Sequence, residues 1–111
     1  MSIITLTTDF GNKDFFVASV KGAILTEVKN AVVIDISHEI QPYNHSEAAY
    51  IIKNAYKSFP KGTIHIIGVE SELTPENKHI AMVFEGHYFI GSDNGIFSMI
   101  KDDLRAEKIV E

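Results

Sequence analysis

Three short apolar runs rich in β-branched residues recur along the chain, at residues 3–6, 31–36 and 63–69. The runs are continuous rather than alternating, which is typical of strands covered on both faces by helices. The stretches between them are long enough for helical crossovers, and strands joined in this way are normally parallel with right-handed connections. The spacing therefore predicts a βαβαβ unit.

The first crossover segment carries a single apolar stripe. Val17, Val20, Ile24 and Val28 recur at helical spacing, and Asp14 suits the first turn as an N-cap. We therefore expect a helix from Asp14 onward, with its stripe against the sheet.

The second crossover segment shows both a start and a stop signal. Asn44 with Glu47 three residues later resembles a capping box, and Ala48 and Ile52 follow on one helical face. Residues 60–62, Pro-Lys-Gly, end this predicted helix.

Two further apolar runs, residues 79–84 and 87–91, are separated only by Glu85 and Gly86, which is typical of a hairpin. Residues 96–111 hold a short amphipathic segment and one more candidate strand from Glu107. The chain predicts one α/β domain over residues 1–111, a three-layer α/β/α fold with a mixed, mainly parallel sheet. We expect it to be a truncated or excised domain.

Composition excludes several function classes. The formal net charge of −5 lacks the basic surface that nucleic acid binding requires. The absence of cysteine removes disulfides and thiolate chemistry and suits a reducing cytoplasm. Neither a signal peptide nor an apolar run long enough to cross a bilayer is evident. We expect a cytoplasmic protein that binds neither nucleic acid nor membrane.

Polar side chains cluster where the predicted strands end. In open α/β sheets ligands bind at the carboxyl ends of parallel strands. The residues delivered there are Thr8, Asp9, Phe10, Ser37, His38, Glu39, Glu70, Ser71, Ser92, Asp93 and Asn94. An ionised carboxylate accepts two hydrogen bonds from a ribose diol, so Asp9 is the first candidate for ligand binding. The sequence leaves open that Asp9 only caps a turn.

Several other polar residues are open to more than one interpretation. Glu70 suits a general base, a water-orienting group or a solvated loop carboxylate, and Tyr43 suits stacking on a base or sulfonium as well as surface packing. His38 suits the crevice or a hydrogen bond to a loop, whereas His65 suits a packed sheet position. Gly11 belongs to no glycine-rich phosphate loop, and the histidines show no metal-ligand spacing. A nucleoside without a phosphate chain is favoured.

Several of these segments together resemble the S-adenosylmethionine (SAM) hydroxide adenosyltransferase family. The resemblance is carried by residues 7–11, 14, 20–22, 35–40, 59–65 and 91–95, in order along nearly the whole chain. It implies cleavage of SAM by water to adenosine and methionine, with SAM as substrate and no cofactor. Related halogenases use fluoride or chloride instead.

The resemblance also implies an assembly and a set of binding residues. The family fold adds a C-terminal β domain, absent from this chain, and forms homotrimers that bind substrate between the two domains of neighbouring subunits. Asp9 matches the ribose-binding aspartate, Asp14 a second acid near the ribose and Tyr43 an aromatic position beside the substrate. With Phe10, Asp93 and Asn94 at the strand ends, these are the expected substrate-binding residues.

The chain departs from the family pattern in residues 69–77. Glu70 stands for the aspartate that orients water, and Asn77 for the arginine that favours developing hydroxide, so these are the candidate catalytic residues. An amide lacks the guanidinium charge, and the loop glycines are absent. Two functions follow: a SAM hydrolase domain, inactive by itself, or a catalytically degenerate nucleoside-binding or oligomerisation module. Halogenation is the least favoured reading.

Overall fold

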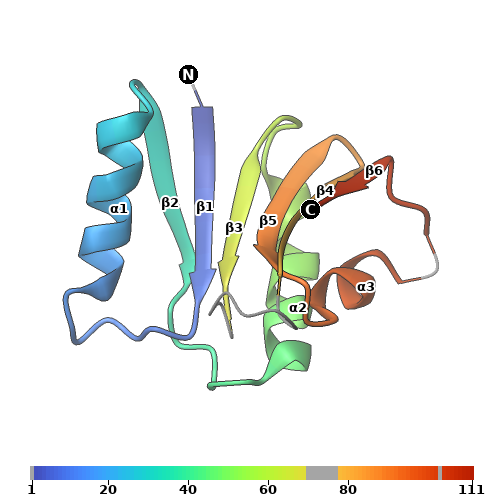
Figure 1. Cartoon of the computed structure of the whole chain (residues 1–111), viewed down its shortest axis with the longest axis horizontal. Coiled ribbons are helices and arrows are strands. Elements are labelled where there is room, and N and C mark those ends of the chain that lie inside the picture. The colour runs from blue at the N-terminus through green and yellow to red at the C-terminus, as the bar shows by residue number, and fades with distance from the viewer. Residues whose placement is uncertain (1, 70–77, 103) are drawn as a thin grey trace.

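The computed structural model describes residues 2–69, 78–102 and 104–111, which build one six-stranded sheet with helices on its faces (Figure 1). Glu70 and Asn77 lie outside the described residues. The strands are β1 (Ser2–Thr8), β2 (Ala31–Ser37), β3 (Ile64–Gly68), β4 (His79–Phe84), β5 (His87–Ser92) and β6 (Lys108–Val110). The helices are α1 (Phe16–Glu27), α2 (His45–Ala55), α3 (Ile96–Lys101) and the 3-10 helix η1 (Tyr56–Ser58).

The sheet is mixed and mainly parallel, as the sequence predicts. Its strand order is β2-β1-β3-β5-β4-β6, with β2, β1, β3 and β5 parallel to one another. The predicted hairpin is confirmed, because β4 pairs antiparallel with β5 across a turn in which Glu85 and Gly86 both have positive φ. The predicted last strand is β6, which pairs with β4.

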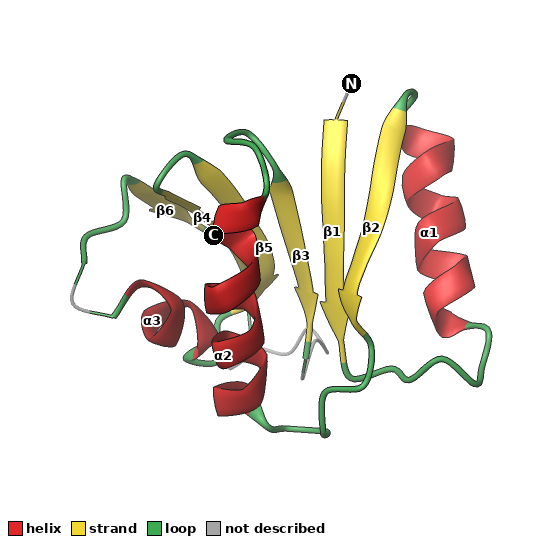
Figure 2. Cartoon of the chain, turned by 180° about the vertical axis from the view of Figure 1, so that it is seen from behind, coloured by secondary structure: helices red, strands yellow, loops and turns green. Residues whose placement is uncertain are grey.

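The helices lie on opposite faces of the sheet, which confirms the three-layer arrangement. From behind, α2 and α3 cover one face, whereas α1 lies beside β2 at the other side of the sheet (Figure 2). The core fills the α2 and α3 face, where Ile52, Met82, Phe84 and Phe89 are almost completely buried. On the opposite face, Tyr88 and Ile90 of β5 remain exposed. The largest cluster of buried apolar side chains therefore lies on the face that α2 and α3 cover.

The start of α2 follows its predicted cap in part. The Asn44 side chain accepts a hydrogen bond from the Glu47 backbone at 3.0 Å, as expected of an N-cap. The Glu47 carboxylate accepts from the Gln41 backbone at 2.8 Å instead of returning to Asn44. The second hydrogen bond of a capping box, from the Asn44 backbone to Glu47, is thus replaced by one from the loop that precedes the helix.

The start of α1 differs from the prediction. The helix begins at Phe16 and its N-cap is Phe15, which no side chain of the described residues caps. The Asp14 carboxylate accepts from the adjacent Phe15 backbone at 2.7 Å, so it is not the cap of this helix. The Asn12 side chain donates to Glu39 at 3.1 Å. This hydrogen bond ties the segment before α1 to the loop after β2, and the helix starts only after it.

A buried polar chain lies at the amino ends of β3 and β5. The Thr5 hydroxyl bonds Nδ1 of His65 at 2.7 Å, and Nε2 of His65 bonds Nδ1 of His87 at 3.1 Å. The Tyr56 ring makes T-shaped contacts with both imidazoles. Burial lowers the pKa of His65 to about 4, with a further contribution from His87. His65 is thus a packed and hydrogen-bonded sheet residue, as the sequence indicates.

Within the part of the chain that the structure describes, no helix is long and apolar enough to cross a membrane.

Candidate functional site

A shallow hollow of about 220 Å³ opens where β1 and β2 end. Three backbone hydrogen bonds join the segments that form it: Asp9 N to Gly68 O at 3.3 Å, Gly11 N to His38 O at 2.8 Å and Ile40 N to Thr8 O at 3.4 Å. The hollow is lined by Asp9, Phe10, Gly11, His38, Glu39, Ile40, Gln41 and Pro42. Parallel pairing thus brings the ends of β1, β2 and β3 to one edge, where the sequence predicts a ligand.

The chain turns sharply at Gly11, whose φ of +74° favours glycine. This turn follows directly after Asp9 and Phe10. It allows the Gly11 amide to reach the His38 carbonyl, which fixes the far end of the segment that borders the hollow.

Behind the hollow, a network of side chains joins the ends of β1 and β2. The Thr8 hydroxyl bonds Nδ1 of His38 at 2.6 Å, and Nε2 of His38 bonds the Asp35 carboxylate at 2.8 Å. Lys21 of α1 completes the network through an ion pair with Asp35 at 2.6 Å. Partial burial raises the pKa of Asp35, but the hydrogen bonds from His38 and Lys21 outweigh it, so the pKa lies below its usual value. Asp35 is accordingly a carboxylate at neutral pH.

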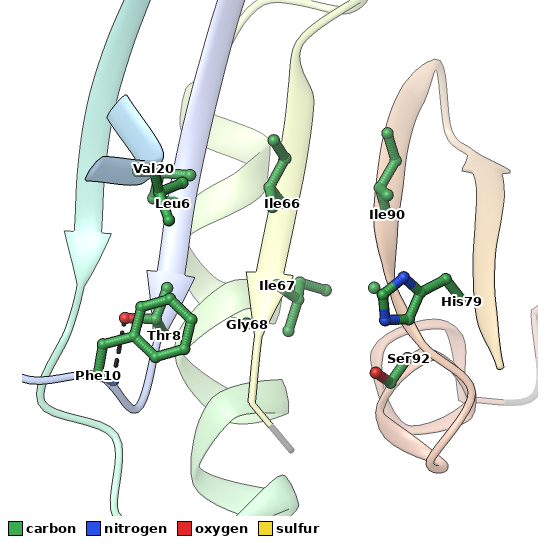
Figure 3. Close-up of a pocket in the computed structure, with 11 residues that line it drawn as sticks. Leu6, Thr8, Phe10, Val20, Ile66, Ile67, Gly68, His79, Ile90 and Ser92 are labelled. Carbon is green, nitrogen blue, oxygen red and sulfur yellow. Dashed lines mark hydrogen bonds between the residues drawn. The ribbon is translucent and has the colours of Figure 1, made fainter. Parts of the chain in front are cut away.

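Phe10 folds back over the sheet instead of extending into solvent (Figure 3). Its backbone amide donates to the Thr8 hydroxyl at 3.2 Å, and its ring lies over Gly68. A Cβ on Gly68 would stand 3.2 Å from the Phe10 ring and 3.1 Å from the Thr8 methyl group, so glycine makes this close approach possible. Phe10 thereby lines both the polar hollow and a neighbouring apolar one.

The apolar hollow, about 180 Å³ in volume, lies on the face of the sheet that carries α1. Leu6, Val20, Ile66 and Ile90 form its walls, and Ser92 lies at its lower end (Figure 3). The Ser92 hydroxyl is buried and has no hydrogen-bond partner among the described residues. The sequence places Ser92 at the strand edge but gives no sign of this burial.

The six predicted substrate-binding residues do not all meet at the polar hollow. Asp9 and Phe10 line it, and the loop that contains Tyr43 borders it through Pro42. Tyr43 itself is 72% exposed, with a φ of +61°. Asp14 is also exposed and does not line the hollow.

The two residues after β5 point to different places. The Asn94 side chain donates to the Val69 carbonyl at 2.9 Å, which ties the end of β5 to the end of β3. Asp93 lines a separate hollow with Lys101, beside α3 and β6. The two candidate catalytic residues, Glu70 and Asn77, lie outside the described residues.

The sequence did not indicate that His38 is bonded to Thr8 and Asp35, or that Asp35 is paired with Lys21. It did place Thr8 and His38 at neighbouring strand ends, which is one part of this network. Among the described residues, no group of three or more metal-ligating side chains lies close enough together to hold an ion.

Comparisons with known proteins agree with the fold. Residues 4–111 match the SAM hydroxide adenosyltransferase N-terminal domain. A (R)-S-adenosyl-L-methionine hydrolase of Methanocaldococcus jannaschii is 37% identical over the whole chain, which spans 44% of that relative. A fluorinase of Actinopolyspora mzabensis is 34% identical over 56% of the chain and 21% of the relative.

Solved structures show the same architecture. The crystal structure of an uncharacterized conserved protein from Thermotoga maritima matches 96% of this chain and 41% of its own, with a TM-score of 0.87 and 30% identity. A conserved hypothetical protein from Thermus thermophilus matches 98% of this chain and 46% of its own, with a TM-score of 0.84 and 27% identity. The chain thus spans less than half the length of these relatives.

Proposed function

Since this chain belongs to the SAM hydroxide adenosyltransferase family and matches its N-terminal domain, we propose that it supplies the nucleoside-binding edge of a SAM hydrolase. The observation that carries the proposal is the polar hollow at the ends of β1 and β2, with Asp9 in its wall. A carboxylate in this position is suited to accept both hydroxyls of a ribose. The hollow contains no glycine-rich phosphate loop, in keeping with a ligand that lacks a phosphate chain.

The reaction is a displacement at the ribose C5′ carbon. The oxygen of water forms a bond to C5′ while the bond from C5′ to the sulfonium sulfur breaks, and the sulfur keeps the electron pair. Methionine leaves as a neutral thioether, adenosine forms and one proton of the water is released to a base or to solvent. The substrate carries its own leaving group, so the proposed reaction uses no cofactor.

Binding at Asp9 has two tasks in this reaction. It fixes the ribose, and it thereby aligns C5′ with the incoming water, which lowers the entropic part of the barrier. Glu70 is proposed to orient that water and Asn77 to stand at the position that faces the developing hydroxide. The amide of Asn77 supplies no full positive charge there, which favours slow turnover.

The direct test of the site is calorimetric titration of this chain with adenosine and with SAM. We expect Asp9→Asn to weaken binding about tenfold or more, because the amide loses one acceptor and the negative charge. Asp102→Asn is the matched control, since the Asp102 carboxylate is exposed, pairs with Lys53 and does not line the hollow. Equal affinity of wild type and Asp9→Asn would contradict the placement of the ribose.

Turnover is tested separately, in a protein that carries this domain at the length of its relatives. Incubation with saturating SAM should yield adenosine and methionine in equal amounts. Adenosine binding without any product would favour the second function, a catalytically inactive binding module, which the Asn77 substitution already suggests.

We further propose that the longer protein is a cytoplasmic homotrimer, with substrate held between this domain and a second domain of a neighbouring subunit. The absence of cysteine suits a reducing compartment, and the shallow hollow suits a site completed by another surface. Light scattering of the longer protein should give the mass of three chains. A monomeric mass would contradict the proposed assembly.

A further inference from the structure

One residue, His38, holds both ends of the segment that carries Asp9. Its ring bonds the Thr8 hydroxyl at 2.6 Å, just before the segment, and its backbone carbonyl accepts from Gly11 N at 2.8 Å, just after it. We propose that His38 is a positioning residue, which acts through Thr8 to set the place of the Asp9 carboxylate at the hollow. The identity of the ligand rests on the proposed function, whereas the network itself does not.

Asp35 sets the direction of its own hydrogen bond in this network. As a carboxylate it can only accept, so Nε2 of His38 donates to it. In the uncharged tautomer that carries its proton on Nε2, Nδ1 is an acceptor, and the Thr8 hydroxyl donates its proton to it. Its oxygen remains available as the acceptor for the Phe10 amide at 3.2 Å. The order of donors and acceptors thus passes from Phe10 through Thr8 and His38 to Asp35.

Burial makes this network rigid at the end that borders the hollow. The relative exposure is 2% for Thr8 and 3% for His38, so water does not compete for their hydrogen bonds. At the other end, Asp35 is partly exposed and is paired with Lys21 of α1. The ion pair of Lys21 and Asp35 holds the His38 imidazole in place. The imidazole in turn holds the Thr8 hydroxyl, which accepts a hydrogen bond from the Phe10 amide.

A second threonine–histidine pair, which joins β1 to β3, serves as an internal control. Thr5 bonds His65 at 2.7 Å, and both side chains are buried to the same extent as Thr8 and His38. This second pair faces α2 and lies at the amino end of the sheet, away from the hollow. Thr5→Val and Thr8→Val therefore remove the same kind of hydrogen bond, but only the latter borders Asp9.

The first experiment measures adenosine affinity by calorimetry. We expect Thr8→Val to weaken binding about tenfold, and Thr5→Val to leave it within about twofold, although both reduce stability. His38→Asn should bind more tightly than His38→Ala, because the Asn side chain carries an acceptor in the position of Nδ1. If both His38 variants fail to fold, the two threonine variants still decide the question. Equal affinities for Thr5→Val and Thr8→Val would overturn the proposal.

The second experiment needs no ligand and therefore separates this proposal from the proposed function. Nitrogen NMR should show Nδ1 of His38 as the unprotonated ring nitrogen, and Thr8→Val should shift its resonance. The same change should speed hydrogen exchange of the Phe10 amide relative to the global exchange of each variant. Unchanged exchange at Phe10 would overturn the positioning role. Faster Phe10 exchange in Thr8→Val, together with no adenosine binding by the wild-type protein, would support the network and contradict the proposed ligand.

Discussion

Acidification from pH 7 to pH 5 should weaken the fold through His65. This residue is 1% exposed, and burial lowers the pKa of its imidazole from 6.5 to about 4. Between these two values the unfolded chain binds a proton that the folded chain does not. Stability is therefore fully present above pH 6.5 and is lost as the pH falls towards 4.

The size of the effect follows from the two pKa values. One proton linked to unfolding, with pKa values of 6.5 unfolded and about 4 folded, removes about 2 kcal/mol of stability between pH 7 and pH 5. Below pH 4 the loss reaches about 3 kcal/mol. The pKa of His87 is also lowered, through burial and the charge of Lys61, while Glu85 opposes the shift. His87 therefore adds to the loss in the same direction.

The assay is urea unfolding followed by far-ultraviolet circular dichroism, since the chain contains no tryptophan. The comparison pairs Thr5→Val with the double variant Thr5→Val/His65→Phe. Both lack the Thr5 hydroxyl, and the phenyl ring takes the place of an imidazole whose centroid lies 5.0 Å from Phe89 and 5.8 Å from Phe59. Their difference in pH dependence therefore reports the titration of His65 together with any change in that of its hydrogen-bond partner His87.

We expect the free energies of the two variants to shift relative to each other by about 2 kcal/mol between pH 7 and pH 5, with the double variant losing less. Working above pH 5 keeps most carboxylates ionised, so they contribute little. Parallel pH curves for the two variants would refute the reasoning, because they would mean that the folded chain protonates His65 without cost.

Three further changes test the packing and the helix ends, each by urea unfolding. Asn44→Ala should cost about 1 kcal/mol, because the Glu47 amide loses its cap, and an unchanged midpoint would contradict that role. Gly91→Ala should cost about 1–3 kcal/mol, because its Cβ would lie 2.8 Å from the Ile67 carbonyl oxygen; a neutral result would show that β3 and β5 can move apart. Gly22→Ala, in α1 with open space around it, should instead stabilise by up to about 1 kcal/mol, and a loss would indicate an unrecognised contact.

The strand framework could be predicted because each apolar run carries its own signal. Continuous runs bounded by turns gave β1, β2 and β3, and the two-residue turn at Glu85 and Gly86 gave the hairpin. Parallel order alone then places Asp9 and His38 at the same edge. These features depend on local chain chemistry and on general rules of connection.

The details of the site depend on contacts between distant residues, which the sequence pattern does not contain. The register between β1 and β2 shifts after Leu6, so that Thr7 pairs with Ser37 and Ile36 is skipped. This irregularity lies directly before Thr8, where the bond to His38 forms. Asp14 gave a misleading cap signal, because its carboxylate is taken by the adjacent Phe15 amide. Aspartate is a common N-cap residue, but the chain enters α1 along a path on which the Asp14 side chain does not cap the helix.

The position of β1 has a consequence for how the chain folds during synthesis. This strand is made first, yet it occupies the interior of the sheet between β2 and β3, and its bond from Thr5 to His65 spans 60 residues. Its second ladder cannot be complete until Gly68 has left the ribosome. Until then the apolar residues of β1 have an unpaired edge, and closing so long a loop is slow. The central part of this sheet should therefore be completed only after β3 has emerged.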